Sequence, residues 1–365
     1  MSKQDKNNSN ILKKILKVIV TIVICIALLF VLLITYLSIT EYKPGEVETI
    51  KILNNASEEI SRDKEISMMT WNIGYGALGD NADFFMDGGK MVNTATKKRL
   101  DKNLNNIEEF VRNEDTDIKF FQEMDTSSYR SHYTNEYKRM GKVLHDSASA
   151  LAYNFKVKFI PYPLPPIGKV ESGISTFSEY KINSAERIKL PTPFKWPVRI
   201  ANLKRCLLVT KLPIAGSDKE LVLINLHLEA FDDGSGKVEQ TKKLKEYMDK
   251  EVAKGNYVIA AGDFNQTFSN IDASMYPVLW DSWVAGLIDQ KDIGSGYQML
   301  MDNSAPTCRS NHKVYSERDP NKPYQYFMID GFIVSDNVKV SDVSTKNLDF
   351  KSSDHNPVLL KFTLK

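Results

Sequence analysis

The sequence predicts an α/β fold over residues 63–365, preceded by one transmembrane helix at residues 18–40. Short apolar runs typical of buried strands alternate with two clear amphipathic helix patterns. Polar side chains gather where those runs end, and α/β folds commonly present functional groups at such positions. About 300 residues lie beyond the N-terminal apolar stretch, which is enough for one large domain or two ordinary ones.

The N-terminal stretch has the length of a membrane span. Residues 18–40 contain no charged side chain, and a helix needs roughly 20 residues to cross a bilayer. No small-residue cleavage site follows the stretch, and the residue before Cys25 is too large for lipoprotein processing. A long, cleaved signal peptide is the alternative. Five lysines and only Asp5 precede the stretch, which predicts that residues 1–17 form a basic cytoplasmic tail.

This orientation predicts a single-pass protein of the cell membrane, with its C-terminal domain on the extracytoplasmic side. Residues 41–62 are polar and include Pro44-Gly45, so we expect them to form a juxtamembrane linker. Residues 274–289 are expected to form a helix and a loop. The oligomeric state is not predicted by the sequence.

The charge distribution argues against a strongly basic nucleic-acid-binding protein. The whole chain has a formal net charge of +2, and the part beyond residue 40 has a net charge of −2. Residues 187–211 nevertheless hold seven basic side chains and no acidic one, with Trp196 among them. This run is either a surface for anionic lipid or a polyanionic substrate, or a strand pair with solvated basic faces.

The cysteines and histidines do not predict a zinc site, because their spacing matches no common zinc-binding pattern. The chain has three cysteines, and Cys25 lies inside the apolar stretch. Whether Cys206 and Cys308 form a disulfide is left open by the sequence.

Two predicted strands in the first half of the domain end in side chains that suit a ligand site. A strand over residues 66–71 is followed by Asn72 and two nearby glycines, which allow close approach of the backbone to a ligand. After a helix over residues 97–113, a second strand ends at Glu123, a suitable ligand for a hard cation. The long loop over residues 77–96 is expected to cover part of the site.

Three strands in the second half carry the remaining polar groups. The apolar run over residues 221–228 brings His227 to its end, and the run over residues 257–261 leads into Gly262-Asp263-Phe264-Asn265. Alternation along an extended chain places Asp263 and Asn265 on the same side. The expected strand over residues 326–334 contains Asp330, which requires a partner because an unpaired buried carboxylate is costly.

A histidine is a good partner for that carboxylate. Of the five histidines, only His227 and His355 lie at strand ends beside carboxylates. Two imidazoles, several carboxylates and two amides fit metal-assisted attack of water on a phosphate ester. Arg130 and Arg309, in nearby loops, are candidates for binding the substrate phosphate.

The order of these motifs resembles the endonuclease/exonuclease/phosphatase superfamily, which includes deoxyribonucleases, apurinic endonucleases, inositol polyphosphate phosphatases and bacterial neutral sphingomyelinases. The resemblance extends from about residue 65 to the C-terminus. The matching stretches are Trp71-Asn72-Ile73, Phe121-Gln122-Glu123, Ser172-Gly173-Ile174, Asn225-Leu226-His227-Leu228, Gly262-Asp263-Phe264-Asn265, Ile329-Asp330-Gly331-Phe332 and Ser353-Asp354-His355-Asn356-Pro357. It implies a two-sheet, four-layer α/β sandwich of the deoxyribonuclease I type, with residues 63–365 as the catalytic domain.

The resemblance also implies a role for each site residue. Glu123 would be the main ligand of a metal, usually Mg²⁺ with Mn²⁺ as an alternative, and Asn72 and Asp354 would support the metal site. Asp263 would activate or orient the attacking water, and Asn265 would bind the phosphate. His227 would stabilise the transition state or protonate the leaving group. His355 would contact the phosphate and be oriented by Asp330. One metal or two remains open.

The superfamily indicates a metal-dependent phosphoric ester hydrolase but does not fix the substrate. One candidate is a sphingomyelinase-like or phospholipase C-like activity on lipid headgroups, favoured by the membrane helix. Another is an extracellular nuclease. A third, of a different class, is a catalytically silent binding module. The sequence does not separate a monoesterase from a diesterase, although we expect a phosphodiester substrate.

Overall fold

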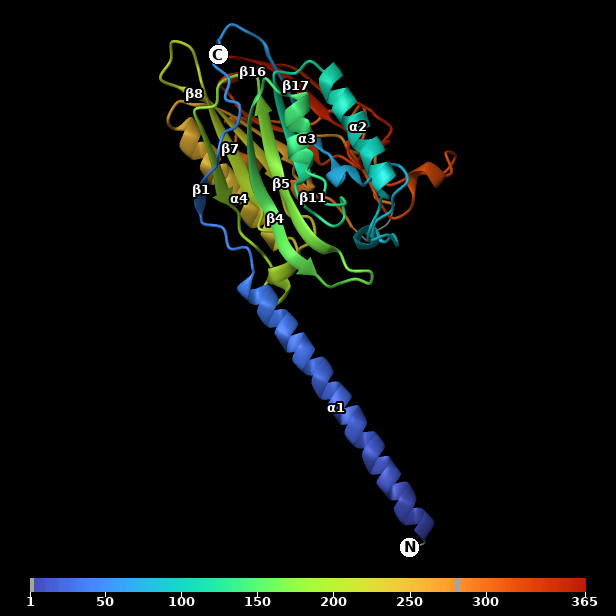
Figure 1. Ribbon diagram of the computed structural model, residues 1–365. Helices are drawn as coiled ribbons and strands as arrows, with labels where there is room; N and C mark the ends of the chain where they lie inside the picture. Colours follow the sequence, from blue (N-terminus) through green and yellow to red (C-terminus); the bar gives the residue numbers. More distant parts are fainter. Residues whose placement is uncertain (1–2, 280–282) are drawn as a thin grey trace.

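Two mixed β-sheets pack face to face in the computed structural model, with helices on their outer sides (Figure 1). The structure describes residues 3–279 and 283–365. The spatial order of the seven-stranded sheet is β1-β6-β7-β8-β9-β15-β12, and that of the six-stranded sheet is β16-β17-β2-β3-β5-β4. This is the α/β sandwich that the sequence predicts.

The strand bounds agree with most of the apolar runs. The seven-stranded sheet is formed by β1 Val47–Thr49, β6 Ser184–Lys189, β7 Cys206–Pro213, β8 Glu220–His227, β9 Tyr257–Asp263, β15 Asp330–Ser335 and β12 Tyr297–Leu300. The six-stranded sheet is formed by β16 Val338–Thr345, β17 Val358–Leu364, β2 Ile66–Asn72, β3 Ile118–Asp125, β5 Gly168–Ser178 and β4 Ala148–Ile160. Two short pairs are β10 Gln266–Phe268 with β11 Gly286–Ile288, and β13 Cys308–Arg309 with β14 Tyr326–Phe327.

The described residues form five α-helices and four short 3-10 helices. The α-helices are α1 Lys3–Ile39, α2 Lys97–Asn113, α3 Glu136–Val143, α4 Ser235–Val252 and α5 Gln290–Ile293. The 3-10 helices are η1 Gly74–Gly76, η2 Phe85–Asp87, η3 Val198–Ala201 and η4 Tyr315–Glu317. The predicted helix over residues 97–113 is confirmed. It starts where the Thr96 side chain accepts from the backbone N–H of Arg99, and its apolar stripe from Leu100 to Val111 is buried.

The main core lies between the two sheets. Phe120, Leu223, Ile259, Phe332 and Leu360 all belong to it and are fully buried. These residues come from the apolar runs that predicted the strands. The core therefore fixes the sheets relative to each other, and with them the strand ends that carry the polar groups.

Residues 41–62 are not a linker, contrary to our expectation. The segment supplies β1, which pairs with β6, and Leu53 forms a bridge with Ser149. Ile60 is fully buried in the main core. The apolar residues of segment 41–62 were too sparse to predict a strand. The segment nevertheless joins the sheet, because its partner strand β6 comes from a distant part of the chain.

Two smaller expectations also differ from the structure. The predicted strand over residues 326–334 is two strands, β14 and β15, in different sheets. The described part of residues 274–289 contains β11 and turns but no helix, and Trp280 lies outside the described residues.

At the N-terminus, α1 projects away from the domain (Figure 1). Its part Asn10–Ile39 is long and apolar enough to cross a membrane. A signal sequence near an N-terminus has the same properties.

Candidate active site

Three neighbouring strands of the seven-stranded sheet bring His227, Asp263 and Asp330 together. The register of the parallel pair β8–β9 places His227 opposite Asp263, and that of the antiparallel pair β9–β15 places Asp330 opposite Asp263. Gly262 allows this close pairing, because a Cβ atom at that position would lie 2.0 Å from the carbonyl oxygen of Leu226. The local sequence therefore admits only glycine just before the central carboxylate.

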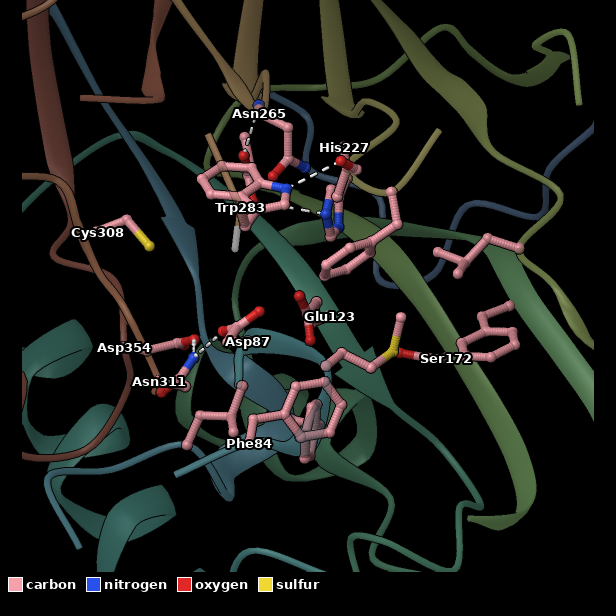
Figure 2. Close-up of a pocket in the computed structure, with 18 of the residues that line it drawn as sticks. Phe84, Asp87, Glu123, Ser172, His227, Asn265, Trp283, Cys308, Asn311 and Asp354 are labelled. Carbon is pink, nitrogen blue, oxygen red and sulfur yellow. Dashed lines mark hydrogen bonds and ion pairs between the residues drawn. The ribbon is translucent and has the colours of Figure 1, made fainter. Parts of the chain in front are cut away.

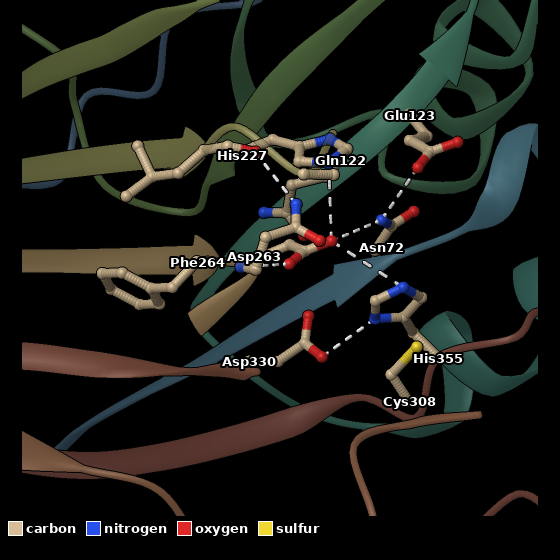
Figure 3. A network of polar contacts seen from close by, with 12 residues as sticks. Asn72, Gln122, Glu123, His227, Asp263, Phe264, Cys308, Asp330 and His355 are labelled. Atoms are coloured by element: carbon tan, nitrogen blue, oxygen red, sulfur yellow. Dashed lines mark hydrogen bonds and ion pairs between the residues drawn. The ribbon is translucent and has the colours of Figure 1, made fainter. Parts of the chain in front are cut away.

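His355 reaches the same place from the loop before β17. Its Nδ1 lies 2.9 Å from an oxygen of Asp330, and its Nε2 faces Asp263 Oδ2 at 3.7 Å. The expected pairing of His355 with Asp330 is therefore present. His227 approaches from the other side, with Nε2 at 3.5 Å from the same Asp263 oxygen (Figure 3).

Asp263 is the centre of this network. The side-chain amide of Asn72 donates to Asp263 Oδ2 at 3.0 Å, and the backbone N–H of Asn265 donates to Oδ1 at 2.9 Å. The side-chain amide nitrogen of Asn265 donates one of its two N–H groups to the carbonyl of Leu228 at 2.9 Å. One carboxylate oxygen thus meets two imidazoles and one amide, an arrangement suited to holding and polarising a water molecule.

Burial and charge alter the pKa values of these groups. Burial, followed by repulsion from Asp330, raises the pKa of Asp263 to about 7. Burial alone would lower the pKa of His355, but the carboxylates of Asp330 and Asp263 raise it well above the ordinary value. Burial and the positive charge of Arg205 lower the pKa of His227 well below the ordinary value. The two imidazoles therefore differ, one favouring the charged form and one the neutral form.

A group of carboxylates lies on the other side of Asn72. The amide of Asn72 also donates to Glu123 Oε1 at 3.1 Å. Glu123 has a left-handed backbone, with φ of 55°, at an irregularity in the β3–β5 pairing. A Cβ on Gly74 would lie 2.9 Å from Asp354 Oδ1, so only glycine leaves room for this carboxylate.

Asp87 completes this group, although the sequence did not identify it as a site residue. The side-chain amide of Asn311 donates to Asp354 Oδ2 at 2.7 Å and to Asp87 Oδ2 at 3.1 Å (Figure 2). The loop over residues 77–96 thus covers part of the site, as expected. The sequence of this loop has no periodic pattern that would distinguish Asp87 from the other aspartates as a site residue.

These carboxylates fit a hard divalent cation. Burial raises the pKa of Glu123, and the negative charge of Asp354 raises it further. Burial also raises the pKa of Asp87 to about 6, again with a contribution from Asp354. Buried oxygens that repel one another are relieved by a bound cation, and Mg²⁺ prefers carboxylate and amide oxygens. Glu123 and Asp354 are therefore the residues that would hold it. Asn72, also expected to support the metal, turns its amide nitrogen toward Glu123, and its oxygen accepts from the backbone N–H of Gly74 at 3.0 Å.

Asp263, Asp330 and His355 also offer three ligand atoms within 4.8 Å of one another. The two nitrogens of His355 already face two different carboxylates. The direct bond to Asp330 and the depth of the cluster in the sheet favour a proton-bearing relay there.

Arg130 and Arg309 line the pocket, but their guanidinium groups are engaged within the protein. Arg130 donates two hydrogen bonds to Asp125 and stacks on Tyr75 at 3.6 Å. Arg309 donates to Asn311 Oδ1 and to the carbonyl oxygens of Leu78, Gly79 and Ser310. This geometry makes them tethers for the site loops and does not favour the predicted role in phosphate binding.

The basic run 187–211 is largely paired inside the protein. Arg187 is buried and donates to backbone carbonyls, and Arg205 pairs with Glu229 at 3.3 Å. Lys211 pairs with Glu251 at 3.0 Å. Both interpretations of this run as an exposed basic surface were therefore wrong for most of its residues, because acids distant in the sequence neutralise it. Cys206 and Cys308 are both buried and free, so they do not form a disulfide in the structure.

The polar network opens into a cavity of about 230 Å³ with a largely apolar wall. Figure 2 shows Phe84 and Trp283 beside the polar groups. Trp283 donates from Nε1 to the carbonyl of Ala230 at 2.9 Å. Its place in the wall depends on contacts with Ala230 and Phe327, which are distant in the sequence, and no local pattern predicts them.

A family model supports the same assignment. The model described as the endonuclease/exonuclease/phosphatase family matches residues 69–355. The chain belongs to this family. The match spans the described motifs from Trp71 to His355, so the family's phosphoester hydrolase chemistry applies to this domain at a coarse level.

Solved structures share the fold at low sequence identity. An endonuclease/exonuclease/phosphatase from Beutenbergia cavernae has a TM-score of 0.55 and 17% identity, over 82% of this chain and 72% of that one. A family protein from Bacteroides vulgatus has a TM-score of 0.53 and 15% identity, over 83% and 100%. D. rerio TDP2, complexed with a single-strand DNA product, has a TM-score of 0.52 and 15% identity, over 82% and 100%. No curated protein matches the chain.

Proposed function

We propose that this protein is a divalent-metal-dependent phosphodiesterase that acts on the extracytoplasmic side of the cell membrane. The supporting observation is the convergence of His227, His355 and Asn72 on one oxygen of Asp263, beside the carboxylates of Glu123 and Asp354. Such a set can hold a cation, a phosphate and a water molecule within one small site.

The chain's own residues divide the work in this mechanism. Asp263 orients the attacking water and accepts its proton, and its raised pKa suits a base working near neutral pH. His355, held by Asp330, is cationic and contacts a phosphoryl oxygen. His227 is neutral and donates an N–H hydrogen bond to the leaving oxygen, which takes its proton from solvent after the P–O bond breaks. Asn265 binds the phosphate through the side-chain N–H that does not donate to Leu228. A bound Mg²⁺ or Mn²⁺ would supply neutralisation of the phosphoryl charge.

We propose a lipid headgroup as the phosphodiester, in a sphingomyelinase-like or phospholipase C-like reaction. The apolar wall supports this choice, because Phe84, Phe155 and Trp283 offer contacts to the hydrophobic part of a lipid. The internal pairing of the basic run points the same way, since a polyanion would need free cations.

An extracellular nuclease is the second candidate. The D. rerio TDP2 structure with a single-strand DNA product is the observation that favours it, since it holds nucleic acid on a similar fold. A catalytically silent binding module is a third, and it would have no need for a histidine relay and a separate carboxylate group in one buried site.

The test uses the full chain in detergent with Mg²⁺, offered phosphocholine-lipid vesicles and plasmid DNA in the same buffer. We expect headgroup release that a chelator abolishes. His355→Ala should lose orders of magnitude in rate, whereas His145→Ala should keep it, because that ring is exposed outside the site. Nicking without headgroup release would support the nuclease, and metal binding without hydrolysis of either substrate would support the binding module.

A further inference from the structure

The last turn of α1 is docked on the domain. Leu37 is 5% exposed, whereas its neighbour Ile39 is 79% exposed. Ser38 accepts from Trp196 Nε1 at 3.2 Å. Directly after the helix, the buried carboxylate of Glu41 pairs with Arg199 at 3.1 Å and Lys204 at 3.2 Å. The domain therefore follows the helix without a flexible spacer, and the face around Trp196 lies next to whatever surrounds the end of α1.

Exposed apolar side chains gather at this end of the domain. Tyr162 is 73% exposed and Leu164 88% exposed, in the hairpin between β4 and β5. Trp196 and Val198 are 58% and 57% exposed, at the start of η3. Figure 1 shows that the hairpin and the yellow-green turn near residue 200 lie at the end where α1 enters. Large exposed apolar groups are costly in water, so their grouping on one face indicates a partner.

The two segments are held together as one unit. Val157, Ile160 and Val170 of the hairpin form a small core cluster against which Ala201 packs. The backbone N–H of Lys204 also donates to the carbonyl of Asn154 at 2.7 Å. The exposed side chains are therefore presented by a common rigid support, which lowers the cost of ordering them on a partner.

The charge of this face suits a membrane surface. Lys158 and Lys195 are exposed among the apolar groups, whereas Arg199 and Lys204 on the same face are paired with Glu41. Aromatic and basic side chains prefer the interface between lipid headgroups and hydrocarbon. A soluble partner protein would not need this face to lie beside the end of an apolar helix.

We propose that Tyr162, Leu164, Trp196 and Val198 form a membrane-contact surface that inserts into the leaflet bordering the end of α1. The inference rests on the proposed function in one respect, namely that α1 spans a bilayer. Phe155, Ile160, Ile167 and Ala201 of the same support also line the catalytic cavity. The surface therefore turns an apolar wall of the cavity toward the lipid, so that an amphiphilic phosphoester reaches the catalytic residues without crossing water.

The distance is consistent with that path. Phe155 pairs with Ser172, which in turn pairs with Asp125, and Ile160, the last residue of β4, lies five positions beyond Phe155. At a rise of ~3.3 Å per residue, Ile160 lies about 17 Å beyond the level of Phe155, and Leu164 lies in the connection beyond it. A lipid would have to rise partly out of the leaflet, and the apolar wall between Ile160 and Phe155 accommodates its hydrophobic part.

The test places an environment-sensitive fluorophore on a cysteine at position 164. The full chain carries Leu164→Cys with Cys25→Ser, is reconstituted in phosphatidylcholine vesicles, and is labelled from outside, since Cys206 and Cys308 are buried. The matched control is His145→Cys, because residue 145 is exposed just before β4 and the 13-residue strand places it about 40 Å from the tip. We expect blue-shifted emission and quenching by nitroxide-labelled lipid at position 164 only.

Activity gives a second, independent measurement. Leu164→Asp should lower hydrolysis of vesicle lipid about tenfold, the factor expected when burial of one leucine in an apolar environment is lost. Hydrolysis of a water-soluble chromogenic phosphodiester should not change. If the wild type cleaves no lipid, the proposed substrate fails, while quenching at position 164 still supports membrane contact.

Two results would overturn the membrane contact. Position 164 could behave like position 145, with water-like emission and no quenching by nitroxide lipid. Alternatively, its emission could shift only as protein density in the vesicles rises, which would assign the surface to a second copy of the chain.

Discussion

Asp330→Asn separates the role of the buried relay from the stability of the fold. The substitution keeps the size of the side chain but removes the charge 2.9 Å from His355 Nδ1. That charge raises the pKa of His355 and also raises that of Asp263 through repulsion. Without it, the imidazole loses both its cationic form and its fixed orientation, because the amide of asparagine can also donate to Nδ1.

The size of the loss follows from the geometry. A hydrogen bond to a charged group contributes about 1.5–3 kcal/mol. The Coulomb energy between unit charges ~4 Å apart is about 4 kcal/mol at an effective dielectric constant of 20. Because each 1.36 kcal/mol changes a rate about tenfold, we expect kcat to fall roughly 10²–10³-fold.

Stability should move differently. Asp330 and Asp263 are buried side by side at one register position, and their repulsion opposes folding. Asp330→Asn relieves this repulsion but also removes the charged partner of His355, and because the two effects oppose each other the thermal midpoint should change little. The matched control is Asp342→Asn, an exposed carboxylate in β16, which should alter neither quantity.

The assay is initial-rate hydrolysis of a phosphodiester with Mg²⁺, alongside calorimetric unfolding of the same samples. Near wild-type kcat in Asp330→Asn would refute the relay. A rate loss that tracks a lower thermal midpoint would instead assign Asp330 a structural role.

Three further predictions concern the metal, the glycine beside it and pH. Mg²⁺ at ~100 times its Kd should stabilise the wild type by about 2.7 kcal/mol, measured by thermal unfolding with and without chelator, and Glu123→Gln should abolish this stabilisation. Equal stabilisation of the wild type and the variant would exclude Glu123 as a ligand. Gly74→Ala should weaken Mg²⁺ affinity in calorimetric titration and cost about 1 kcal/mol of stability, because φ is +52° and its Cβ would approach Asp354; unchanged affinity would contradict the close approach. In metal-free protein, lowering the pH from 7 to 5 should reduce the unfolding free energy of the wild type by about 2 kcal/mol more than that of His227→Gln. The reason is that His227 takes up a proton below its ordinary pKa in the unfolded chain, whereas the buried ring of the folded protein stays neutral. If denaturant titrations give a difference between the two proteins that does not vary with pH, His227 is not a neutral, buried ring.

Most of the site residues could be predicted from the sequence, because each follows an apolar run that indicates a buried strand. The apolar run before Gly262 and Asp263 predicts a buried strand with a carboxylate at its end, and β9 has these bounds. The apolar stripe of α2 and the strand ending at His227 were recognised in the same way. These features depend on periodicity and burial, which the chain expresses over a few consecutive residues.

The partners of charged groups were decided only by the tertiary structure. Arg130 was expected to meet phosphate, but Asp125 and Tyr75 occupy its guanidinium group. The basic run around Arg205 was expected at the surface, but Glu229 pairs with it. A charge is the same in sequence whether it is free or neutralised, because its partner arrives through packing between elements distant in the chain.

The sequence by itself therefore determined the central strands that carry the motifs, the order of those motifs and the apolar N-terminal helix. Only the tertiary structure decided that Asp330 lies opposite Asp263, that Asp87 and Asn311 join the carboxylates, and that residues 41–62 belong to the domain. Strand register and loop packing set these contacts. Both depend on the shape of the whole core and on which side chains it brings within a few ångströms, and no local window of the sequence contains that information.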